Sequence, residues 1–135
     1  MRCVKLASIL LLMMVTACGS YEVKNVQSDA DRFMELLSRG DANGAFAMCD
    51  PNAVSLQVLQ NIGNNPDYDE VLDDFQGFEH QEGAQSKRDA DDKLTELRLA
   101  PTKFKGHEGW LAHFVFRRID DDWKIIAFKI ESPAP

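Results

Sequence analysis

Hydrophobic side chains recur at helical spacing directly after residue 27. Four of them occupy positions i, i+3, i+4 and i+7 and form one apolar face: Ala30, Phe33, Met34 and Leu37. Ser28 and Asp31 have the spacing of a capping box at the start of this helix, and Gly40 is a stop signal just beyond its end. The pattern predicts a helix over residues 28–39.

Three shorter helical segments follow this helix. The apolar spacing predicts them over residues 42–49, over residues 53–62 and over one or two turns between Tyr68 and Gly77. Asp50-Pro51 separates the first two, because a residue before proline is pushed out of the α region. The first half of the chain is therefore expected to be helical.

The hydrophobic period changes to two in the second half. Alternation predicts a strand over residues 93–99, and two long β-rich runs over residues 110–119 and 123–130 form an antiparallel hairpin. Both hairpin strands carry apolar residues on both faces, so we expect them to be central in a sheet. Residues 78–87 are polar and fit an edge strand or a loop. Helices followed by antiparallel strands indicate an α+β fold.

The first 18 residues have the form of an export signal. A basic start precedes an apolar run over residues 6–15, and small residues stand directly before Cys18. The apolar run is about half of the roughly 20 residues that a membrane-spanning helix needs. The stretch resembles a bacterial lipobox, which implies cleavage after residue 17 and a lipid on the sulfur of Cys18. An ordinary cleaved signal with an incidental cysteine is the alternative.

The predicted export signal and its cleavage site divide the chain into three parts. Residues 1–17 are the signal peptide, residues 18–27 a tether, and residues 28–132 a single α+β domain. The resemblance places the protein in a bacterial cell envelope, held in the membrane at Cys18 and facing the periplasm or the exterior. Gly19 stands where an inner-membrane retention signal has aspartate, which favours the outer membrane.

Charge and cysteine content narrow the function classes. The formal net charge is −7, and cleavage removes two basic residues and no acid, so nucleic acid is an unfavourable partner. Only Cys49 remains as a free thiol, in an apolar stretch that predicts burial and low reactivity. The acids between Asp67 and Asp74 lack the spacing of a calcium loop, so neither a metal site nor a cofactor is expected.

The order of elements and two motifs indicate a family. Residues 40–45 (GDANGA), after the capped helix, resemble the G-D-x-x-x-A turn of the nuclear transport factor 2-like (cystatin-like) superfamily. Residues 114–125, with an acidic turn before Trp123-Lys124-Ile125, are similar to the closing hairpin of such domains. The resemblance implies N-terminal helices packed on a curved antiparallel sheet, shaped as a cone that holds a pocket. Phe33, Met34 and Leu37 are then expected to pack on the last two strands.

Two specific functions are compatible with these features, and a domain that only shields or spaces, with no ligand, is a third possibility. The first is a non-catalytic module that binds an envelope protein or a small apolar ligand. The second is a small-molecule enzyme of the isomerase or dehydratase type that uses His113 as general base in the cone pocket. His113 lies in an apolar strand with no acid near it in sequence. We therefore expect that no carboxylate lies within hydrogen-bond reach of His113 and that apolar groups line any pocket. Both expectations favour the binding module over the enzyme.

Overall fold

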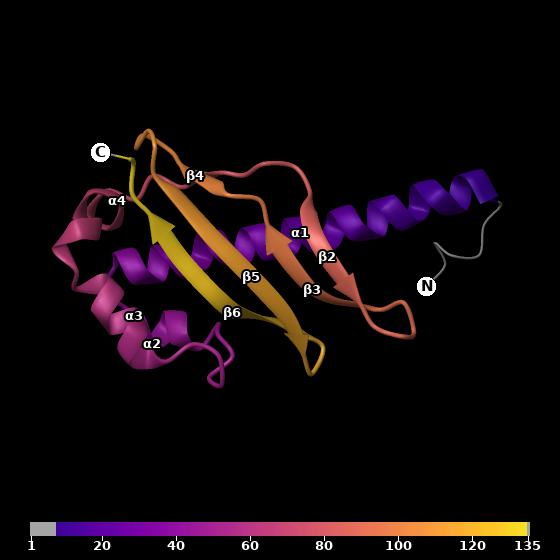
Figure 1. The fold of residues 1–135 in the computed structure, drawn as a ribbon, viewed down its shortest axis with the longest axis horizontal. Coiled ribbons are helices and arrows are strands. Elements are labelled where there is room, and N and C mark those ends of the chain that lie inside the picture. The colour runs from indigo at the N-terminus through magenta and orange to yellow at the C-terminus, as the bar shows by residue number, and fades with distance from the viewer. Residues whose placement is uncertain (1–7, 135) are drawn as a thin grey trace.

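The computed structural model describes the backbone of residues 8–134 and the side chains of residues 21–134. Helices come first and strands second, which confirms the predicted α+β order (Figure 1). The elements are α1 (Ser8–Ser38), α2 (Ala42–Phe46), α3 (Leu56–Gly63), the 3-10 turn η2 (Pro66–Tyr68), α4 (Asp69–Asp73), β1 (Phe78–Glu79), β2 (Ala84–Arg88), β3 (Leu94–Leu99), β4 (Thr102–Phe104), β5 (Leu111–Ile119) and β6 (Asp122–Glu131).

The six strands form one antiparallel sheet that is not closed, organised around β5. β3 and β4 pair with successive parts of one edge of β5, and β6 pairs with the whole of the other edge. β1 extends the sheet beyond β4, and β2 extends it beyond β3. Helix α1 runs along one face of this sheet, while α2, α3 and α4 gather near its last turns (Figure 1).

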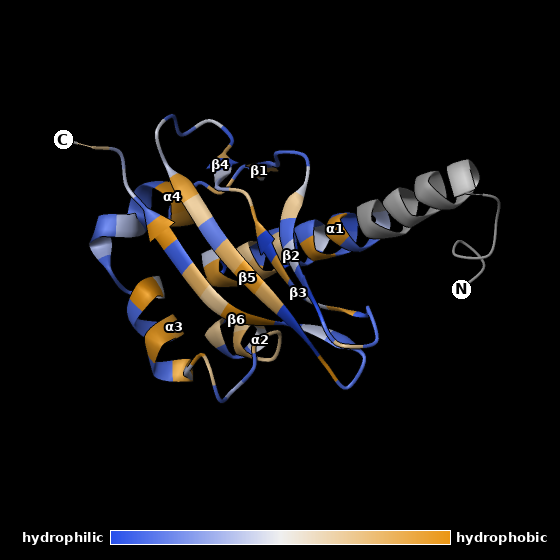
Figure 2. Ribbon diagram, turned by 45° about the vertical axis from the view of Figure 1, so that its right-hand side comes forward, coloured by the Kyte–Doolittle hydropathy of each residue, from blue (hydrophilic) through white to orange (hydrophobic). Residues whose placement is uncertain are grey.

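The apolar face of α1 packs on the sheet as the sequence predicted. Phe33 is completely buried, and its ring meets Phe114 of β5 at 5.8 Å and Phe128 of β6 at 4.8 Å, both edge to face. Met34 and Leu37 are buried in the same core. Hydrophobic and hydrophilic residues alternate along β6, as expected for a strand with one covered face (Figure 2).

The predicted start of this helix at Ser28 is wrong. α1 is continuous from Ser8, so Ser28 lies in its middle and has no capping role. The stretch from residue 21 to residue 27 is helical because its side chains also contact the rest of the domain: Val26 is fully buried, and Glu22 binds two residues of the β5–β6 hairpin. Gly40 (φ +80°) does follow the last turn, as predicted.

Several boundaries differ from the sequence prediction. α3 begins after Ser55, whose hydroxyl accepts from the Val58 amide, and not after Asn52. The polar stretch over residues 78–87 contains two short strands, β1 and β2, joined by a loop. β4 was not predicted, because three residues are too few for a periodic signal.

The β5–β6 hairpin is confirmed, but β6 is not a central strand. Asp120 and Asp121 both have positive φ (51° and 67°), the conformation of a two-residue type I′ turn. Among the strands and bridges of residues 8–134, the outer edge of β6 pairs only at Ile125, which bridges to Cys49. Strict alternation would put Ile125 on the face opposite Phe128 and Ile130, which made the strand look apolar on both faces. A bulge at Ile126 shifts the register and returns Ile125 to the buried face.

The cleavage site and Cys18 lie outside the residues whose side chains the structure describes. Within the described chain, no helix combines the length and apolar character needed to cross a membrane.

Candidate functional site: a groove between helix α1 and strands β2 and β3

A groove of about 670 Å³ lies between α1 and the β2 side of the sheet. This volume falls within the range of roughly 300–1,000 Å³ typical of small-molecule sites. Its lining comes from α1, from the loop between β1 and β2, and from β2 and β3: Val23, Lys24, Gln27, His80, Gln81, Glu82, Gly83, Ala84, Ser86, Arg88, Leu94 and Leu97.

The apolar part of the lining comes from both walls. Leu94 and Leu97 of β3 are buried, and the half-buried Ala84 stands beside them on β2. Val23 of α1 is half-buried and packs against the same core. An apolar portion of a ligand therefore has surface to contact on the helix and on the sheet.

Amide side chains hold the β1–β2 loop in place. Gln27 of α1 donates from Nε2 to the carbonyl oxygen of Gln81 at 3.0 Å. Gln81 donates in turn from Nε2 to the carbonyl oxygen of Pro101 at 2.9 Å, just before β4. These two bonds attach one wall of the groove to the helix and to the sheet at once.

His80 belongs to the groove lining and pairs with a carboxylate on α1. Its Nε2 lies 3.0 Å from Oδ1 of Asp31, and its ring meets Phe78 edge to face at 5.6 Å. The other ring nitrogen, Nδ1, is buried and has no hydrogen-bond partner in the described part of the chain. The pair therefore fastens the loop to α1 and leaves Nδ1 covered by protein atoms.

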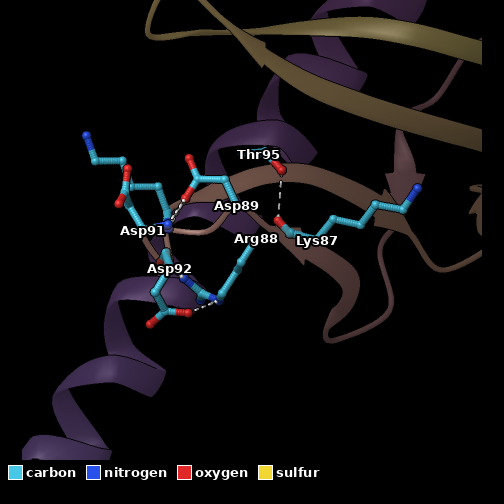
Figure 3. A network of polar contacts seen from close by, with 7 residues as sticks. Lys87, Arg88, Asp89, Asp91, Asp92 and Thr95 are labelled. Atoms are coloured by element: carbon cyan, nitrogen blue, oxygen red, sulfur yellow. Dashed lines mark hydrogen bonds and ion pairs between the residues drawn. The ribbon is translucent and has the colours of Figure 1, made fainter.

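Basic side chains stand at the groove on both walls. Arg88 lies within the turn that joins β2 to β3 and pairs with Asp92: its Nε is 4.0 Å from Oδ1 of Asp92 (Figure 3), and its Nη1 donates to the Asp92 carbonyl oxygen at 3.0 Å. Oδ1 of Asp89 shapes this turn by accepting from the amides of Asp91 and Lys93. The turn thus holds the Arg88 guanidinium, while Lys24 projects from α1 as an exposed cation.

His113 lies elsewhere, on the sheet face opposite α1, and one expectation about it is wrong. Its Nε2 lies 2.7 Å from Oε1 of Glu131, so a carboxylate is within hydrogen-bond reach. The hairpin register explains the contact: His113 is opposite Lys129, and Glu131 is the next residue of β6 on the same face. His113 is a third exposed and does not line the groove.

The expectation of an apolar pocket is also wrong, because polar and charged residues line much of the groove.

His107 has a structural role that the sequence did not reveal. In the sequence it stands between Gly106 and Glu108, far along the chain from the acids between Asp67 and Asp74. The structure buries His107 between them: its Nε2 donates to the carbonyl oxygen of Asp74 at 2.7 Å, and Nδ1 lies 3.3 Å from Oε2 of Glu70. The bond to the Asp74 backbone is the main cause that raises the pKa of His107, and Glu70 adds to it, while burial opposes both.

We expect this contact to stabilise the protein more at acidic pH than at alkaline pH. A raised pKa means that the contribution is complete below about pH 6.5, the value in unfolded chains, and is lost as pH rises through the folded-state pKa. Above that point Nδ1 no longer donates to Glu70. His107→Gln should therefore lower the free energy of unfolding by about 1 kcal/mol at pH 5.5 and by less at pH 8.5. Urea unfolding at both pH values measures the difference, with Val58→Ala, at an exposed apolar position, as the control. An equal cost at both pH values would contradict this assignment.

Cys49 is buried, as its sequence context indicated. Burial raises the pKa of its thiol to about 12, although Lys124 acts in the opposite direction. The Sγ atom lies 3.6 Å from the carbonyl oxygen of Ala45. The thiol therefore stays protonated near neutral pH and is a poor nucleophile.

Among residues 21–134, no group of three or more His, Cys, Asp and Glu side chains is arranged to hold a metal ion.

A comparison of the chain with models of protein families, with curated proteins and with solved structures found no match. The resemblance to nuclear transport factor 2-like domains therefore stays a prediction about the family, beside an α+β architecture that the structure shows.

Proposed function

We propose that the protein is exported, lipidated at Cys18 and active at the bacterial cell envelope as a non-catalytic binding module. The groove between α1 and β2–β3 is its ligand site. The observation that carries this proposal is the composition of the groove: an apolar surface shared by two walls, next to hydrogen-bonding and basic groups. The membrane partner is the bilayer that holds the anchor, and Gly19 favours the outer membrane.

The binding function fits the side chains better than the enzymatic alternative does. A general base needs a nitrogen or oxygen that reaches substrate in a cavity. His113 has a carboxylate partner but stands outside the groove, on a partly exposed sheet face. His80 does line the groove, yet its Nε2 is bonded to Asp31 and its Nδ1 is buried. Neither imidazole presents a free nitrogen to the cavity.

The curved cone of the nuclear transport factor 2-like domains is part of the same proposal. The long α1 against the face of the sheet, and a groove between them, are consistent with such a cone. A binding module of this kind needs a rigid wall, which the Phe33 contacts supply, and an opening, which the β1–β2 loop borders.

The anchor is tested by Cys18→Ser. We expect this variant to lose all fatty-acid label and to accumulate as unprocessed or soluble protein, because the sulfur is the only attachment point that the lipobox provides. Metabolic labelling with an alkyne fatty acid, followed by membrane fractionation, measures both effects. Cys3→Ser in the signal is the matched control and should label normally. Equal labelling of the Cys18→Ser variant would end the lipoprotein proposal.

A further inference from the structure

We infer that the ligand of the groove is a monoacyl anion: one apolar chain that ends in a single acidic head group, such as a free fatty acid. This deepens the proposed function and rests on it for the source of the ligand, which is the membrane beside the anchor.

The charges at the groove select an anion. Lys24 and Arg88 line it from opposite walls, and Glu82 is the one acid among the lining residues. The lining residues carry one more positive than negative charge in a chain whose formal net charge is −7, and Asp92 of the adjoining turn offsets part of the charge of Arg88. Lys24 has no ion-pair partner among the described side chains, so its ammonium is free to meet a carboxylate. Arg88 is paired with Asp92 of the β2–β3 turn, whose Oδ1 lies 4.0 Å from its Nε, and it has further N–H groups to donate.

The uncharged lining selects an apolar chain. Leu94 and Leu97 on the sheet wall, with Val23 across from them, give a hydrocarbon chain contacts on two sides. A small inorganic anion would leave this surface unused, and a metal cation would meet two basic side chains and a single acid. An amphipathic anion is the class that satisfies both parts of the groove.

The position of the groove indicates where such a ligand comes from. Val23 and Lys24 follow Cys18 by five and six residues, which corresponds to about 8–9 Å along a helix. α1 is helical through this stretch, and Glu22 is fastened to the β5–β6 hairpin by a 2.7 Å contact with Arg118. A lipid on Cys18 would thus hold the groove close to the bilayer, where acyl anions concentrate.

Photo-crosslinking tests this inference on the full-length lipidated protein in phosphatidylcholine vesicles. The probe is palmitic acid that carries a diazirine in its chain. We expect cross-links on α1 near Val23 and on β3 near Leu97, competed by palmitate and not by hexadecanol. Lys24→Glu, on an exposed side chain, should reduce the yield about tenfold, as expected for loss of a charged contact. Arg39→Glu, which makes the same charge change just after the end of α1 and away from the groove, should leave it unchanged.

Besides the absence of any cross-link in the groove, three outcomes would overturn the inference. They are equal competition by hexadecanol, equal loss with Arg39→Glu, and equal labelling of the groove by a diazirine phosphatidylcholine, which would indicate a bilayer lipid as the occupant. Failure of the proposed function is distinguishable, because an unlipidated protein would lack fatty-acid label on Cys18 whatever the groove binds. Groove labelling without that label would contradict the anchor alone, and a labelled Cys18 with an unlabelled groove would contradict the ligand alone.

Discussion

Replacing Phe33 with alanine should lower the free energy of unfolding by about 3–5 kcal/mol, the typical cost of removing a buried aromatic ring. Phe33 is completely buried at the centre of the interface between α1 and the sheet. Its ring meets Phe114 and Phe128 edge to face, so the substitution opens a cavity between two hairpin strands and the helix. Surrounding side chains cannot close this cavity without moving α1 as a whole.

Urea unfolding followed by the fluorescence of Trp110 and Trp123 measures this effect. Val58→Ala is the matched control, because Val58 is 48% exposed on α3 and its truncation should change stability by less than about 0.5 kcal/mol. A loss at Phe33 as small as that at Val58 would show that α1 does not pack on the sheet through this face.

The burial of Phe33 between α1 and the sheet could be predicted from the sequence, because the hydrophobic periodicity indicates both the helix and the strands. Apolar positions at i, i+3, i+4 and i+7 define the buried face of α1, and the acidic turn over residues 120–122 between long β-rich runs defines the hairpin. Each of these two patterns is local: one covers successive turns of the helix and the other successive residues of the strands. The packing of the helix on the sheet then follows, because the helix and the sheet must each cover an apolar face.

The start of α1 was missed because a local capping signal competed with a tertiary one. Ser28 and Asp31 fit a capping box, yet the helix continues through them. Val26, four residues before Ala30, extends the same apolar face and was a signal of this continuation. The contact of Glu22 with Arg118 joins residues 96 positions apart and leaves no trace in the local pattern.

The groove could not be predicted from local sequence patterns either, because it depends on contacts between distant stretches of the chain. Its lining comes from three separate stretches of chain, and the polar loop between β1 and β2 contributes a third of the residues. His80 and Asp31 are 49 residues apart, and nothing in either stretch predicts that they meet. The contact of His113 with Glu131, by contrast, could have been predicted from the sequence. The hairpin had been predicted, and working out its register would have placed the two residues on one face.

Glu22→Ala should cost about 1.5–3 kcal/mol, since it leaves charged and polar donors without their acceptor. The Glu22 carboxylate accepts from Nη2 of Arg118 at 2.7 Å and from Nε1 of Trp123 at 3.3 Å. Arg118 also lies over the Trp123 ring at 5.1 Å, so one carboxylate orients both side chains. Glu22 and Arg118 are less than a third and about a third exposed, which limits solvent screening of the pair.

The loss should be largest in the part of α1 around Glu22. We expect amide hydrogen exchange over residues 21–27 to accelerate by more than tenfold in the Glu22→Ala variant, beyond the rise caused by lower global stability. Glu35→Ala is the control: its ion pair with Arg39 is exposed on the same helix, and its loss should cost less than about 0.5 kcal/mol. Equal exchange in the two variants would mean that the hairpin does not hold this part of α1. Because Val23, Lys24 and Gln27 form one wall of the groove, such a result would also remove the rigid wall on which ligand binding depends.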